Sequence, residues 1–195
     1  WALVLLLGAI GVAAALDRHC AVEACHTPIQ GRKTPVPLVL LQGNIPQDEK
    51  FEPGSGVPMA LQWYRDLLLQ PHRALVVAPE TALPLLPQQL PEGYLQGLQD
   101  HFAQPERAAL IGLPLGSMEE GYTNSVMGLR AGQSEAYRYH KHHLVPFGEF
   151  IPPLFRWFTD LMNIPLGDFN RGALVQPTFD WRGERFAPHI CYEDL

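Results

Sequence analysis

The sequence predicts an α/β fold built on a sheet with parallel strands. Three continuous apolar runs, at residues 38–41, 74–78 and 108–113, have the length of strands that are buried on both faces. Helix-like segments separate these runs, and 19 prolines and 17 glycines fall between the short apolar stretches. A strand, a helix and a second strand in this order predict a right-handed parallel crossover.

The composition limits the class of protein. At 195 residues, with 47% hydrophobic and 17% charged residues, the chain can build one domain of ordinary size and a short appendage. The net charge is -6, and Lys and Arg cluster nowhere beyond Arg32 and Lys33. Because phosphate binding depends on basic surface, we exclude a nucleic-acid partner.

Residues 1–16 are apolar and precede the first charged residue, Asp17. This stretch is shorter than the about 20 residues that cross a bilayer. A signal peptide would need a basic region and an initiator Met, although residues 13–15, all Ala, imitate a cleavage site. We favour the end of a transmembrane helix that begins before Trp1.

Residues 17–36 are expected to form a juxtamembrane linker. Cys20 and Cys25 lie beside His19 and His26 in this stretch, which resembles part of a zinc site. A structural zinc site also needs a matching second pair of ligands elsewhere in the chain, so we expect no metal. The two thiols could pair in an oxidising compartment, and that alternative stays open.

Glu80 is the first candidate site residue. It follows the second apolar run, and residues 58–70 before that run have the apolar spacing of a helix. Chemistry in open α/β sheets gathers at the carboxyl ends of strands, where Glu80 is expected. The alternative, an acidic residue in the first turn of a helix, does not suit the Leu-Pro-rich segment that follows.

Lys141 is the second candidate. After a helix at 93–102, residues 122–129 and 135–139 predict a hairpin, and Lys141 leaves it to enter an apolar Val-Pro-Phe-Gly turn. The adjacent His142 and His143 would point to opposite faces of an extended chain, which argues against a metal site. We interpret Lys141 as a fixed cation.

Cys191 is the third candidate. Residues 177–181 and 185–191 predict a strand pair that ends at this cysteine, and residues 152–162 before it predict a short apolar helix followed by a loop. A lone cysteine after a strand is often an inert, buried side chain. A nucleophilic thiol needs a base and a group that holds the oxyanion, and Glu80 and Lys141 are candidates for these roles.

Three ordered motifs resemble the nitrilase superfamily over residues 37–195. They are Pro-Glu at Glu80, Tyr-x-Lys followed by His-Leu-Val-Pro-Phe-Gly-Glu at Lys141, and Cys-Tyr-Glu at Cys191. Within the superfamily the chain is similar to the apolipoprotein N-acyltransferase family. The similarity lies in residues 42–47 and 143–152, in Asn-Arg-Gly at 170–172 and in the apolar segment ahead of the domain.

This resemblance implies an α-β-β-α sandwich over residues 37–195, incomplete at its C-terminal end and preceded by the end of a transmembrane helix. It implies Glu80 as general base, Lys141 as oxyanion stabiliser and Cys191 as nucleophile, supported by Glu149, Tyr192 and Glu193, with no cofactor. Ala78 departs from the family, which often has Trp there, so the packing beside Glu80 is open. We expect the chain by itself to be inactive, because the resembled fold continues after the cysteine.

The resemblance also implies a multi-pass protein of the bacterial inner membrane, with its catalytic domain facing the periplasm. It would move an acyl chain from a phospholipid through a cysteine thioester to the N-terminal amine of a diacylglyceryl-cysteine lipoprotein. Five apolar residues are expected to form a lipid-facing arm rather than only a buried helix: Phe155, Trp157, Phe158, Leu161 and Met162. The alternatives are a soluble nitrilase-type amidase and an inactive membrane-anchored binding module.

Overall fold

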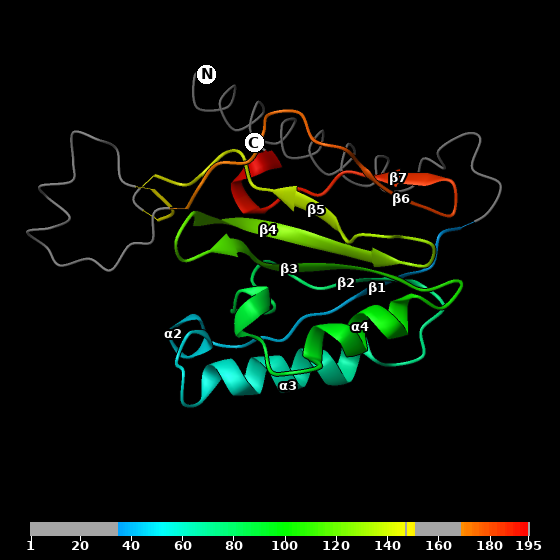
Figure 1. The fold of residues 1–195 in the computed structure, drawn as a ribbon, viewed down its shortest axis with the longest axis horizontal. Coiled ribbons are helices and arrows are strands. Elements are labelled where there is room, and N and C mark those ends of the chain that lie inside the picture. The colour runs from blue at the N-terminus through cyan, green and yellow to red at the C-terminus, as the bar shows by residue number, and fades with distance from the viewer. Residues whose placement is uncertain (1–34, 147, 151–168, 195) are drawn as a thin grey trace, which may run out of the picture. The chain divides into compact units, whose positions relative to one another are not determined.

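A five-stranded mixed sheet is the centre of the computed structural model, which describes residues 35–146, 148–150 and 169–194 (Figure 1). Its strands, in spatial and chain order, are β1 (Leu38–Leu40), β2 (Leu75–Val77), β3 (Ala108–Ser117), β4 (Gly121–Arg130) and β5 (Tyr137–His140). The first three are parallel, which confirms the predicted parallel pairing of these strands. The predicted hairpin of β4 and β5 is also present, but β3 already pairs antiparallel with β4, so the sheet is mixed.

Two helices cover one face of the sheet (Figure 1). Helix α3 (Gly56–Leu68) buries Tyr64 and Leu68, and α4 (Tyr94–Phe102) buries Leu98 and Phe102 in the same core cluster. These helices confirm the predictions at 58–70 and 93–102. Two short elements that the sequence did not reveal are α2 (Gln47–Lys50) and the 3₁₀ turn η1 (Pro87–Gln89). Each is about one turn long and therefore leaves no periodic pattern.

A two-stranded hairpin packs on the other face. Strands β6 (Phe179–Trp181) and β7 (Glu184–Phe186) are joined by Arg182 and Gly183, which have positive φ angles of 50° and 76° as a type I′ turn requires. Phe179 and Trp181 form an apolar cluster with Leu75 and Leu110 of the sheet. The sheet therefore has apolar contacts on both faces.

Two details of the sequence prediction are wrong. The strand expected at 185–191 ends at Phe186, and Cys191 instead opens a 3₁₀ turn, Cys191–Asp194. Pro188 stands between the two and has no backbone N–H for a ladder. The run at 38–41 is also not fully buried, since Leu40 on the edge strand β1 is 75% exposed.

The predicted membrane helix at 1–16, the linker up to residue 34 and the apolar segment 151–168 lie outside the described residues. Where the structure is described, no helix has both the length and the hydropathy needed to cross a membrane.

Gly112 allows the segment after β2 to lie against β3. A Cβ atom at this position would overlap the carbonyl oxygen of Pro79 and lie 2.8 Å from the Cα atom of Glu80. Both neighbours are backbone, which cannot turn aside as a flexible side chain can. The absence of a side chain at Gly112 therefore determines where Glu80 lies.

We expect Gly112→Ala to push Glu80 away from β3 and to lower the free energy of unfolding by about 1–3 kcal/mol, the usual effect of overpacking. Chemical denaturation measures this change. Gly54→Ala is the matched control, because an added Cβ at Gly54 meets no heavy atom within 4 Å. Equal stability of the two variants would show that the Pro79–Glu80 segment adapts freely.

Candidate active site

The Lys141 side chain is buried directly after β5, with only 1% of it exposed. Its Nζ lies 2.9 Å from Oε2 and 3.0 Å from Oε1 of Glu149. A buried ammonium is tolerated only when it is paired and hydrogen-bonded, and Glu149 supplies both conditions. Because an ammonium has three N–H donors, this pairing leaves one for a further acceptor.

Asn124 on β4 joins two carboxylates to this ion pair. Its Nδ2 donates to Oε1 of Glu80 at 2.5 Å and to Oε1 of Glu149 at 2.7 Å, so both amide hydrogens are used. Its Oδ1 is buried and has no hydrogen-bond partner among the described residues. The two carboxylates thus determine the orientation of the amide, at the expense of one unpaired acceptor.

Glu80 lies at the carboxyl end of β2, as the sequence predicts. Its Oε1 is 3.7 Å from Nζ of Lys141, and its side chain is 37% exposed. Lys50 of α2 holds the adjoining backbone by donating to the Glu80 carbonyl at 3.0 Å and to Oγ1 of Thr81 at 2.7 Å. Burial lowers the pKa of Lys50, and the nearby Glu80 charge partly opposes that effect. Glu80 is therefore held in place while remaining accessible.

Glu193 ties the turn that contains the cysteine to the end of β5. Its carboxylate accepts hydrogen bonds from the Tyr139 hydroxyl at 2.7 Å and from the backbone N–H groups of His142, His143 and Ile190 at 2.7, 3.3 and 3.1 Å. Burial alone would raise the pKa of Glu193, but these four bonds outweigh it and lower the pKa. Burial, together with the bond to Glu193, raises the pKa of Tyr139.

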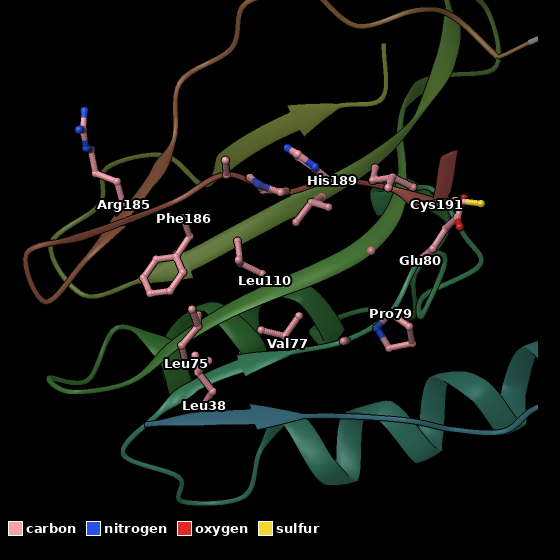
Figure 2. A pocket seen from close by; sticks show the side chains of 16 residues that line it. Leu38, Leu75, Val77, Pro79, Glu80, Leu110, Arg185, Phe186, His189 and Cys191 are labelled. Carbon is pink, nitrogen blue, oxygen red and sulfur yellow. The ribbon is translucent and has the colours of Figure 1, made fainter. Parts of the chain in front are cut away.

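Cys191 is an exposed, free cysteine with a φ angle of +51°. Non-glycine residues seldom adopt this left-handed conformation, and such strain is common at active sites. The thiol and Glu80 lie at one end of a cavity of about 510 Å³ (Figure 2). Apolar side chains from β1, β2 and β3 and Phe186 line much of the rest of this cavity, and Arg185 and His189 also line it.

The structure brings together some, but not all, of the residues singled out in the sequence. Glu80, Lys141 and Glu149 form one hydrogen-bonded cluster, and Cys191 lines the same cavity as Glu80. Tyr192 is 49% exposed. The five apolar residues expected to contact lipid, Phe155, Trp157, Phe158, Leu161 and Met162, lie outside the described residues.

Sequence reasoning gave no role to Asn124, Lys50 or Tyr139. A signal existed for Asn124, because Asn-Ser at 124–125 interrupts an otherwise largely apolar strand. Buried polar groups in a strand need partners and so indicate a site or a network. Tyr139 had a signal as the Tyr of the Tyr-x-Lys motif, whereas Lys50 carries none, since it reaches its partners only through the fold.

A thiol, a carboxylate and a buried ammonium thus gather at one end of a mixed α/β sheet, which defines a candidate centre for nucleophilic cysteine chemistry.

The chain is a homologue of the apolipoprotein N-acyltransferases, which are acyltransferases by name. It is 60% identical to the Verminephrobacter eiseniae apolipoprotein N-acyltransferase over 196 residues, covering 99% of this chain and 37% of that protein. It is 45% identical to the Ralstonia nicotianae apolipoprotein N-acyltransferase over 161 residues, covering 83% of this chain and 31% of that protein. The chain therefore spans about a third of the length of these relatives.

Solved structures of carbon-nitrogen hydrolases are also similar to the chain. The superfamily member XC1258 from Xanthomonas campestris has a TM-score of 0.45 and 20% identity, covering 70% of this chain and 48% of that one. The carbon-nitrogen hydrolase from Helicobacter pylori has a TM-score of 0.44 and 18% identity, with coverages of 77% and 49%. No family model matches the sequence.

We expect Glu149→Ala to destabilise the fold by about 3–5 kcal/mol, because it leaves the buried Lys141 charge with only the more distant carboxylate of Glu80, 3.7 Å away. Urea denaturation measures the change. The double variant Lys141→Met/Glu149→Leu removes both charges and should regain much of the loss. Equal stability of Glu149→Ala and the unsubstituted protein would show that Lys141 and Glu149 do not form a buried ion pair.

The Glu193 carboxylate is expected to make stability depend on pH. Its pKa is lowered in the fold, so its contribution is full above the unfolded pKa of about 4.3 and is lost as the pH falls through the lower folded value. Glu193→Gln should cost about 1–3 kcal/mol at pH 7, and this difference should shrink on acidification to about pH 3. Melting temperatures of both proteins across this range test the sign, with Glu92→Gln on an exposed residue as control. A difference that grows in acid would contradict the assignment.

Proposed function

We propose that the chain carries the reacting groups of an N-acyltransferase that moves an acyl chain from a phospholipid to the N-terminal amine of a diacylglyceryl-cysteine lipoprotein. Cys191 would be the nucleophile, Glu80 the base and Lys141 the oxyanion stabiliser. The observation that carries the proposal is the convergence of Glu80, Asn124, Glu149 and the buried Lys141 beside an exposed thiol. The names of the relatives support the choice of reaction.

In the first half-reaction, Glu80 takes the thiol proton and the Cys191 sulfur attacks the ester carbonyl of the donor lipid. The oxygen of the tetrahedral intermediate accepts a hydrogen bond from the remaining N–H of Lys141. The C–O bond then breaks, Glu80 returns the proton to the departing alkoxide, and the acyl chain stays on sulfur as a thioester.

In the second half-reaction, the amine of the lipoprotein attacks the thioester carbonyl. Glu80 takes a proton from the amine nitrogen, the C–S bond breaks, and the proton passes to the thiolate. The accessibility of Glu80, which is 37% exposed, suits a base that must meet two different substrates. Glu149 neutralises the charge of the Lys141 ammonium. Lys141 would therefore act on either substrate through its remaining N–H donor and not through its charge alone.

The setting of this site is part of the same proposal. We infer that residues 37–195 belong to an α-β-β-α sandwich of the nitrilase type, in which β6 and β7 begin the second sheet. Residues 1–16 would be the end of a membrane helix and 17–36 a linker, so that the site faces a bilayer on the periplasmic side. The apolar residues of the segment at 152–162 would then meet lipid.

We expect Cys191→Ala to abolish formation of an acyl-enzyme when the full-length protein is incubated in detergent with phospholipid labelled in its acyl chain. Gel analysis before and after hydroxylamine treatment, which cleaves thioesters, measures the bond. The double variant Cys20→Ala/Cys25→Ala keeps Cys191 and should retain the label. Label on the Cys191→Ala protein, or none on the double variant, would contradict the assignment of the nucleophile.

A further inference from the structure

A second apolar hollow, of about 260 Å³, lies outside the cavity that contains the thiol. Its walls include Thr81, Leu86, Pro114, Met118, Tyr122 and Phe169. Met118 is 70% exposed and Phe51, which also lines the hollow, is 49% exposed. Large apolar side chains at the rim of a concave surface indicate an apolar occupant.

Three walls of this hollow are attached directly to the candidate active site. Thr81 is the residue after Glu80, and Tyr122 lies two residues before Asn124 on β4. The backbone N–H of Phe169 donates to the carbonyl oxygen of Glu149 at 2.9 Å. The rings of Phe169 and Tyr122 pack edge to face, 5.1 Å apart. The walls of the hollow are therefore attached to the backbone of both Glu80 and Glu149.

Two polar groups along the walls already have partners within the protein. Oγ1 of Thr81 accepts a hydrogen bond from Lys50, and Oε1 of Gln89 accepts one from the backbone N–H of Leu86. A ligand gains little by offering hydrogen bonds to these two groups, whereas it gains by burying hydrocarbon against the apolar walls. The volume is below the about 300 Å³ of the smallest common ligand pockets, so it suits one narrow chain segment.

We propose that this hollow binds the methylene groups that follow the reacting carbonyl of the donor acyl chain. The inference rests on the proposed function and adds to it a place for the acyl chain. The larger cavity contains the thiol and lies on the sheet face that β6 and β7 cover in part, so it is the alternative site that the test must exclude. The smaller hollow lies beside Glu80 without using that face.

The test narrows the mouth of the hollow without touching the reacting groups. Met118→Trp places a larger ring at the rim, and Met59→Trp, at a residue 46% exposed on α3, is the matched control. The rate of acyl-enzyme formation is measured with the full-length protein in detergent, without acceptor, for phospholipids of increasing acyl length. Since each buried methylene is worth about fourfold, loss of two should slow long-chain donors about tenfold or more in Met118→Trp. Short-chain donors and Met59→Trp should be unaffected.

A second measurement does not depend on turnover. The Cys191→Ala protein is incubated with a fatty acid that carries a photoreactive group along its chain, and the cross-linked residues are mapped by mass spectrometry. We expect labels on Leu86, Met118 or Phe169. Labels confined to residues 185–190 would assign the chain to the larger cavity and overturn the inference.

The two measurements separate the inference from the proposed function. If the acyl-enzyme forms but Met118→Trp leaves the chain-length dependence unchanged, the inference fails and the function stands. If no acyl-enzyme forms and the label is still found in the hollow, the function fails and the lipid site stands. Absence of both acyl-enzyme and label would overturn both.

Discussion

Burial of the Lys141 ammonium is the constraint on which the candidate site depends. A cation that is 1% exposed must be paired, and Glu149 pairs it with both carboxylate oxygens. Asn124 then links Glu149 to Glu80, so one buried charge organises three other side chains. Because the Lys141 side chain is almost fully buried, its remaining N–H lies in a medium of low polarity, where hydrogen bonds to a charged acceptor are strong.

The sheet brings the members of this cluster together from distant parts of the chain. Glu80 comes from the end of the parallel strand β2, Asn124 from the antiparallel strand β4, and Lys141 from the residue after β5. The side-chain-free position at Gly112 permits the approach of the Glu80 segment. The parallel half of the sheet therefore supplies the carboxylate, and the antiparallel half supplies the ammonium and the amide that joins them.

Much of this arrangement could be predicted from the sequence. Continuous apolar runs identified β2 and β3, and helix-like segments identified α3 and α4. The fixed cation at Lys141 followed from its place between a strand and an apolar turn. The turn at Cys191 was missed, because the apolar residues before it favour a strand, although Pro188 in the same stretch disfavours one. The link through Asn124 was also missed, since the hydrogen bonds that define it span 25 and 44 residues of sequence.

The four hydrogen bonds to Glu193 have a consequence for motion. They join the residues around Lys141 and those around Cys191 to the same two oxygen atoms. When the end of β5 fluctuates, the thiol and the ammonium should be displaced together, so their separation varies less than the position of either. Thermal fluctuation of the sheet edge would then leave the alignment of the Cys191 thiol with the Lys141 ammonium almost constant.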